Sequence, residues 1–411
     1  MKKQGNGCGF SHCCARFARA FRAFARKTEG QWAPLLFTVA VVLALVGFSV
    51  CAIGLGERAF LSVFHKGAAS PFADFFSSVR DATRGAAVYS ERRVIYPPLA
   101  NAIFWAFSRL MPSAYLEGPM EDFGAYSAPL LAFFAFFALC LALVGLLLAQ
   151  TVRGVMRFPL AGAAVVSFPM LFLLERGNLA VLSLAAILLF VHGCNSPDKG
   201  VRELGLFALG FAAALKIYPL LFALPLLRER RFREVGRAAL WALALFLIPS
   251  FFFGGPLFCA AWILKNTLHY SAYAARGVTQ ALGEWGVSAV AARVGIAVAL
   301  ALLLMLLLWR ALWGREVYKT WAHLAATLLC IPSIFSAYNW VLFLPSLLAF
   351  FEDERPNAKN VPWFLAIATP FCLYLPKAWQ DPLLIALIGL VIALSVVDMA
   401  RQMMKKCQNG A

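Results

Sequence analysis

The sequence predicts an all-α, polytopic membrane protein with about 12 transmembrane helices. Of its 411 residues, 62% are hydrophobic and only 14% are charged, whereas a soluble domain is roughly half apolar and a quarter charged. Apolar runs bounded by charges or turn residues also recur along the whole chain. The net charge of +17 does not indicate a nucleic-acid partner, because the basic residues sit mostly in short connections between these runs, where they orient spans.

Twelve apolar runs account for the predicted spans. They lie at about 34–55, 127–150, 158–174, 178–193, 204–215, 217–227, 238–253, 288–309, 320–335, 339–351, 362–374 and 382–399. Several are shorter than the roughly 20 residues that cross a bilayer, so we expect tilt, extension at their ends or a thinned membrane there.

The distribution of Lys and Arg predicts the orientation of these runs. If the basic N-terminus is cytoplasmic and each run crosses once, 24 of the 37 Lys and Arg residues lie inside, as the positive-inside rule favours. A rival arrangement lets 96–111 cross and merges 204–227 into one helix. It places only 21 of them inside and strands Lys216 near mid-bilayer, at a cost of about 2.5–3.5 kcal/mol. We prefer the first arrangement.

The preferred arrangement divides the chain into consecutive parts. They are a cytoplasmic, basic and amphipathic N-terminus (1–33), an N-terminal transmembrane module (34–253) that contains a long extracytoplasmic segment (56–126), a second extracytoplasmic segment (254–287), C-terminal transmembrane helices (288–399) and a cytoplasmic tail (400–411). Irregular backbone and charge concentrated on one side of a membrane protein indicate where its chemistry takes place.

The first extracytoplasmic segment carries the candidate catalytic residue. In its stretch PFADFFSSVRDATRG, Asp74 lies among aromatic residues such as Phe72 and Phe75, which we expect to form an interfacial helix facing lipid or the neighbouring spans. Such surroundings desolvate a carboxylate and suit it to act as a general base. The alternatives are a helix cap and an ion pair with Arg80 or Arg84.

Three hairpin tips on the same predicted side carry further polar residues. They are Glu175, Arg176 and Asn178 in LLERGNLAVL, Lys216 and Tyr218 in LKIYPLLF, and Tyr338 and Asn339 in PSIFSAYNW. Tyr96, in the rigid step YPPL, joins them from the first segment. Each could instead be a polar turn, a capping or packing residue, or a snorkelling side chain. We also expect Asn178 to cap a helix whose free N–H groups point outward toward an anionic oxygen.

Cations and donors at the lipid–water boundary suit a phosphate whose hydrophobic tail lies in the bilayer. With an acid nearby, they predict group transfer from a lipid-phosphate carrier. No nucleotide-binding loop, HExxH helix or GxSxG elbow occurs in the sequence, so nucleotide hydrolysis, zinc proteolysis and serine hydrolysis have no support. The cluster CGFSHCC (Cys8 to Cys14) matches no strong zinc spacing, so we predict no metal and no other cofactor.

Four motifs in this order resemble glycosyltransferase family 87. They are the acid–phenylalanine pair Asp74-Phe75, YPPL, the turn RGN, and LKIYPLLF followed by the basic stretch RERRFREVGR. The resemblance covers roughly residues 34–350. It implies the GT-C fold, with seven helices in the N-terminal module and interfacial helices in the first long extracytoplasmic segment.

The resemblance implies an inverting sugar transfer at the extracytoplasmic face of the cell membrane. The donor is a sugar, mannose in this family, joined to polyprenyl phosphate, and the acceptor is a lipid-linked or envelope glycan. By motif match Asp74 is the base, with Asp81 as fallback, and the polar residues of the tips bind the substrates. Lys216 and Arg176 stabilise the departing phosphate, and the expected partners are donor, acceptor and membrane lipids.

Two positions depart from the family pattern. Many members have glutamine where this chain has Asn178, and histidine often occurs near the position of Tyr338 and Asn339, for which His269 is a candidate substitute. Two other functions stay open. A lipid or solute transporter or flippase would favour charges at mid-bilayer and matched broken helices, and a non-catalytic assembly factor of the same fold would fit the missing histidine.

Overall fold

The computed structural model describes residues 31–64, 72–117, 127–152, 154–284, 286–314, 316–331, 334, 336–353 and 360–409. Residues 1–30 of the predicted amphipathic N-terminus, with the CGFSHCC cluster, lie outside these ranges. Every regular element within the described ranges is a helix. The all-α prediction is therefore confirmed.

The helices follow one another along the chain with short connections. The α-helices are α2 (Trp32–Leu55), α3 (Glu57–Val63), α4 (Ala73–Ala82), α5 (Ala87–Ser90), α6 (Pro98–Ser108), α7 (Ser113–Glu117), α8 (Ser127–Thr151), α9 (Arg157–Val165), α10 (Phe168–Arg176), α11 (Ala180–Gly193), α12 (Lys199–Leu215), α13 (Leu224–Arg228), α14 (Phe232–Ser250), α15 (Pro256–Glu284), α16 (Ala289–Trp313), α17 (Val317–Leu329), α18 (Leu344–Asp353), α19 (Val361–Ala368) and α20 (Lys377–Asn409). Short 3₁₀-helices extend several of them: η2 (Gly154–Met156), η3 (Tyr218–Ala223), η4 (Phe251–Phe253), η5 (Ala337–Phe343) and η6 (Thr369–Cys372).

Five of the described helices are long and apolar enough to cross a membrane. They are α2, α8, α14 continued by η4, α16 and α20, and the bent pair α9–α10, with an angle of 44°, would make a sixth span. Other predicted runs form shorter apolar helices. Helix α11, with 14 residues, is about 21 Å long against a hydrocarbon core of about 30 Å. The chain is thus a multi-pass helical membrane protein, and the larger number of about 12 crossings is not confirmed.

The apolar run 204–227 forms two helical segments rather than one. Helix α12 ends at Leu215, and Lys216 has an extended backbone with φ −148° and ψ 125°. Both η3 and α13 then begin with a proline in the first turn, Pro219 and Pro225, where the missing N–H does least harm. The single helix that the rival arrangement requires is not formed, and Lys216 lies in a connection between helices.

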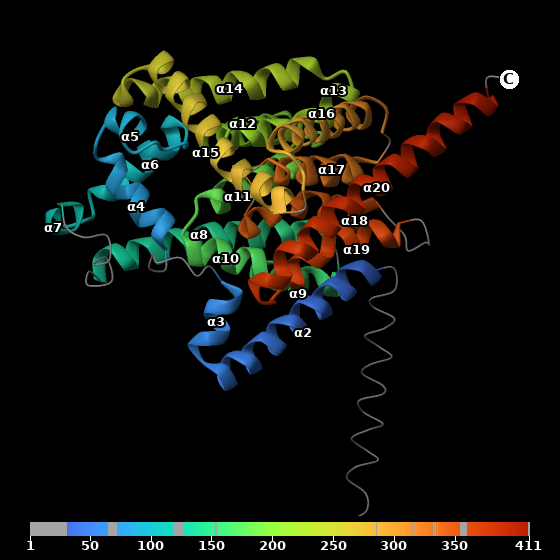
Figure 1. Ribbon diagram of the computed structural model, residues 1–411, viewed down its shortest axis with the longest axis horizontal. Helices are drawn as coiled ribbons and strands as arrows, with labels where there is room; N and C mark the ends of the chain where they lie inside the picture. Colours follow the sequence, from blue (N-terminus) through green and yellow to red (C-terminus); the bar gives the residue numbers. More distant parts are fainter. Residues whose placement is uncertain are drawn as a thin grey trace, which may run out of the picture.

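The helices are stacked in the order α14, α12, α11, α8, α9 and α2 from top to bottom in Figure 1, with successive members in contact. Glycines allow close approach: a Cβ added at Gly193 of α11 would lie 2.8 Å from the carbonyl oxygen of Val201 and 3.0 Å from the Cα of Gly205 in α12. Because lipid supplies no hydrophobic drive between helices, such close packing holds them together. Helix α18 packs against α8 and α11 and connects the C-terminal helices to this stack.

Segment 56–126 places α4, α5 and α6 at one end of the stack, the left end in Figure 1. Phe75 of α4 is fully buried and its ring packs on Phe133 and Phe137 of α8, with centroids 5.0 and 6.2 Å apart. The aromatic face of α4 therefore packs against neighbouring spans and not against lipid, the other surrounding that the sequence left open. Segment 254–287 is mostly the 29-residue helix α15, which packs on α5 and α14. We call this the α4–α6 end.

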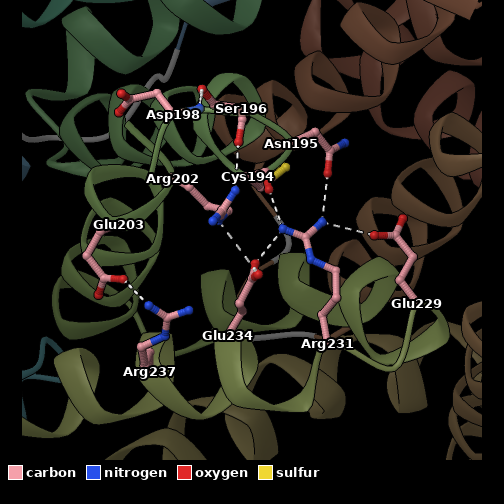
Figure 2. Close-up of polar contacts among 10 residues, drawn as sticks. All are labelled: Cys194, Asn195, Ser196, Asp198, Arg202, Glu203, Glu229, Arg231, Glu234 and Arg237. Atoms are coloured by element: carbon pink, nitrogen blue, oxygen red, sulfur yellow. Dashed lines mark hydrogen bonds and ion pairs between the residues drawn. The ribbon is translucent and has the colours of Figure 1, made fainter. Parts of the chain in front are cut away.

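An ion-pair network lies where α11 ends and α12 and α14 begin, at the other end of these helices. Figure 2 shows its contacts. Arg231 donates to Asn195 Oδ1 at 2.8 Å and to Glu229 Oε2 at 3.0 Å, and it also pairs with Glu234. Arg202 of α12 lies 3.8 Å from the same Glu234. These contacts tie the α11–α12 connection to the start of α14. We call this set of five residues the Arg231 network.

Candidate active site

The turn between α10 and α11 lies directly against the start of α4. The N–H of Phe72 donates to the carbonyl oxygen of Glu175 at 2.6 Å. Gly177 ends α10 with φ +66°, and a Cβ added there would lie 2.8 Å from the Cβ of Phe75. Glycine suits both the left-handed backbone and the close approach. This contact brings Asp74 beside the two polar residues that flank Gly177.

Asp74, in the first turn of α4, is held by two side chains more than 100 residues away in the sequence. Its Oδ1 forms an ion pair with Nη2 of Arg176, and its Oδ2 accepts a hydrogen bond from Nδ2 of Asn178 at 3.0 Å. No side chain caps α4. The ion-pair partner of Asp74 is thus Arg176, not Arg80 or Arg84, and the cap and local-pair alternatives are wrong.

Asn178 has both ends of its amide in use. Its Oδ1 accepts from the N–H of Ala180 at 3.0 Å, and its Nδ2 donates to Asp74 and to the hydroxyl of Tyr96 at 3.1 Å. The N-cap residue of α11 is Leu179, without a side-chain cap, so the prediction that Asn178 is the cap is wrong by one position. The N–H groups of Ala180 and Val181 bond to Asn178, so they do not form the expected anion site. Asn178 positions Asp74 and Tyr96 instead.

Lys216 stands between two tyrosine rings. Its Nζ lies 5.7 Å from the ring centroid of Tyr96 and 5.8 Å from that of Tyr338. Within the described chain, no carboxylate lies in ion-pair range of this ammonium and no hydrogen bond satisfies it. Burial lowers the pKa of Lys216 to about 8, and the charge of Asp74 opposes that shift. A half-buried ammonium without a partner is costly, so Lys216 indicates a site for an anionic ligand.

Two further tyrosines belong to the same site. The ring of Tyr338, at the start of η5, faces Lys216 and also packs edge-on against Phe172, with centroids 6.1 Å apart. Tyr218, two residues after Lys216, lies near Tyr338 and Tyr96. The structure therefore brings together Tyr96, Tyr218 and Tyr338 around the lysine, as the sequence analysis expects.

Glu175 and Asn339 contribute differently. Glu175 interacts electrostatically with Arg176 and Asp74, and its buried Oε2 has no hydrogen-bond partner in the described chain. Asn339 donates from Nδ2 to the carbonyl oxygen of Ile334 at 2.6 Å. The amide of Asn339 therefore holds a local turn, which is the packing role left open for it.

A supporting layer that sequence reasoning missed holds Tyr96 in place. The Tyr89 hydroxyl donates to the carbonyl oxygen of Tyr96 at 3.0 Å, and Asn101 donates to that hydroxyl at 2.9 Å. Asn266 of α15 donates to the carbonyl oxygens of Tyr89 and Val94 at 3.0 and 3.1 Å. Asn101 could have been recognised from the sequence, because it is a polar residue within an otherwise apolar helix after YPPL. Nothing in the sequence around Asn266 indicates its role.

The two fallback residues lie in other contacts. Asp81 pairs with Arg92 at 3.4 Å, and burial raises the pKa of its carboxyl. His269 shares a hydrogen bond of 3.1 Å with Arg93 on an exposed surface. No contact of either residue with Tyr338 or Asp74 is found among the described residues, so His269 does not replace the missing histidine in this structure.

The fold and the site define a multi-pass helical membrane protein in which a carboxylate, a guanidinium and an unpaired ammonium share one end of the bundle. The model of glycosyltransferase family 87 matches residues 95–337. The chain belongs to this family and is a membrane glycosyltransferase.

The matched range contains Tyr96, Arg176, Asn178 and Lys216, whereas Asp74 precedes it. The place of Asp74 in the site therefore rests on its contacts with Arg176 and Asn178. No curated protein and no solved structure matches the chain.

Proposed function

We propose that this chain is an inverting glycosyltransferase of the GT-C type that moves a sugar, mannose by family resemblance, from polyprenyl phosphate to a lipid-linked or envelope glycan. One observation carries the proposal: the Lys216 ammonium has no anionic partner in the described chain, and it lies in the same site as the Asp74 carboxylate. A phosphate supplies the missing anion.

In the proposed reaction, Asp74 takes the proton of an acceptor hydroxyl while the oxygen attacks the anomeric carbon of the sugar. The bond between that carbon and the phosphate oxygen breaks, its electron pair stays on the oxygen, and polyprenyl phosphate leaves. One displacement inverts the configuration, so one carboxylate is sufficient. Lys216 and Arg176 stabilise the charge that grows on the leaving phosphate.

The proposed site faces the extracytoplasmic side of the cell membrane. With the Arg231 network inside, most Lys and Arg residues of the connections are cytoplasmic. The α4–α6 end is then at the opposite boundary, where a sugar on a long polyprenyl tail is presented. Single cysteines at Glu91 and Arg93, exposed residues between α5 and α6 at this end, should react with an impermeant thiol reagent in intact cells. Protection of both until permeabilisation would overturn this orientation.

The chemical assignment is tested in proteoliposomes supplied with polyprenyl-phosphate-mannose and an extract of lipid-linked glycans. Asp74→Asn should lower transfer by a factor of roughly 10²–10⁴, the usual contribution of a general base. Asp81→Asn, on the same helix but paired with Arg92, is the matched control and should keep transfer. Transfer at the wild-type rate by Asp74→Asn would remove Asp74 as the base.

A further inference from the structure

Asp74 is occupied on both carboxylate oxygens in this structure. Arg176 holds Oδ1 and Asn178 holds Oδ2. A general base must present a free lone pair to the acceptor hydroxyl. Because a carboxylate oxygen accepts up to two hydrogen bonds, Arg176 takes part of the capacity of Oδ1 and places a positive group where the acceptor hydroxyl would approach. Release of Arg176 would open Oδ1 fully to the acceptor.

The two partners of Asp74 differ in how firmly they are held. Asn178 is 2% exposed, and its orientation is fixed because Oδ1 accepts from the Ala180 N–H. Arg176 uses Nη2 on Asp74, whereas its buried Nη1 has no hydrogen-bond partner among the described residues. Asn178 is thus a fixed support and Arg176 is a cation with unused donors.

Arg176 and Lys216 lie in the same site. The Lys216 ammonium is 5.7 Å from the ring of Tyr96. The hydroxyl of Tyr96 accepts a hydrogen bond from Asn178, and Asn178 shares Asp74 with Arg176. A phosphate attracted by Lys216 offers several acceptor oxygens, and a planar guanidinium binds two of them at once. Such a phosphate competes directly with Asp74 for Arg176.

We propose that the donor phosphate draws Arg176 away from Asp74 and so uncovers the base. This inference rests on the proposed function. Asn178 keeps Asp74 in place while one of its oxygens becomes free for the acceptor hydroxyl. Proton abstraction is then coupled to occupancy of the donor site, and the donor binds before the acceptor is activated. No bond is made or broken in this step other than the exchange of the ion pair.

The test is the affinity of a polyprenyl phosphate, the leaving group without its sugar, for the full-length protein in nanodiscs. Four proteins are compared: wild type, Asp74→Asn, Arg176→Gln and the double variant. If the phosphate must break the ion pair, Asp74→Asn should bind about tenfold more tightly than wild type. In the Arg176→Gln background the same substitution should change affinity by about twofold or less.

The opposite outcome overturns the inference. If Arg176 stays on Asp74 and only screens it, Asp74→Asn should improve binding more in the absence of Arg176 than in its presence. Asp81→Asn is the control and should leave affinity unchanged, because Asp81 pairs with Arg92 instead.

A second measurement needs only wild type and Asp74→Asn. An infrared difference spectrum on adding the polyprenyl phosphate should show one carboxylate band shifting from paired to free, and Asp74→Asn should lack that band. A spectrum without the band, at saturating phosphate, overturns the exchange alone. If wild type does not bind the phosphate at all, the proposed function fails as well.

Discussion

Replacing Lys216 by methionine should stabilise the fold and remove donor binding. Methionine keeps the length and apolar contacts of the lysine stem but carries no charge to desolvate. Burial lowers the pKa of Lys216 from 10.5 to about 8. Since one pH unit corresponds to 1.36 kcal/mol, the charged lysine costs the folded state about 3 kcal/mol at pH 7. Lys216→Met should raise the free energy of unfolding by up to that amount.

The pH dependence of this difference follows from linkage. Below pH 8 the lysine is protonated in both states and its full cost is present. Between pH 8 and 10.5 the folded state loses the proton while the unfolded state keeps it, so wild-type stability rises with pH. The advantage of Lys216→Met should therefore shrink to about 1.5 kcal/mol at pH 9.5.

The assay is equilibrium unfolding in mixed micelles at pH 7 and 9.5, with and without polyprenyl phosphate. The ligand should stabilise wild type and leave Lys216→Met unchanged. Lys265, which is exposed and lies 4.0 Å from the Trp262 ring, supplies the control: Lys265→Met should stay within about 0.5 kcal/mol. A Lys216→Met protein less stable than wild type at pH 7 would show that the lysine already has a partner, and would refute the reasoning.

Four further outcomes are expected. The KM for the donor should rise above about pH 8 as Lys216 loses its proton, and Lys216→Arg should abolish that rise because a guanidinium stays charged. Asn178→Ala should lower kcat about 10- to 100-fold. Asn178→Asp should be impaired as well, because a carboxylate cannot donate to Asp74. Wild-type activity of Asn178→Asp would contradict a donor role for Asn178. Gly177→Ala should cost about 2–5 kcal/mol in unfolding free energy, from its positive φ and the clash with Phe75. Arg231→Met should cost about 1–3 kcal/mol, because Glu234 and Glu229 keep only one longer ion pair each, with Arg202 and Arg228. The donor KM, measured in the same samples, should stay constant.

The helices themselves could be predicted because hydrophobicity is a local property of the sequence. Each of the twelve apolar runs contains a helix in the structure. Hydrophobicity does not determine the type of helix that a run forms, or how far that helix extends. The runs 217–227 and 339–351 begin as the 3₁₀-helices η3 and η5. A count of apolar runs therefore does not give the number of membrane crossings.

The gathering of the site residues was predictable in outline and not in detail. Placing the hairpin tips on one side of the membrane was enough to expect Asp74, Arg176, Asn178 and Lys216 near one another. Their pairing depends on the fit of Gly177 against α4, a contact between segments about 100 residues apart. No periodicity or spacing encodes such a contact.

The two ends of the bundle differ in how their charges are satisfied, and this difference separates support from function. Arg231 has carboxylate, amide and carbonyl partners, and even the fully buried Arg310 keeps Asp398 as a counter-ion at 3.5 Å. Lys216 has no such partner within the described chain. Because native proteins pair nearly all of their buried polar groups, the cation without a partner is the one that a ligand must complete. The sequence holds more basic residues near Arg231 than near Lys216. The site is therefore located by the cation that lacks a counter-ion, and not by the number of cations in one region.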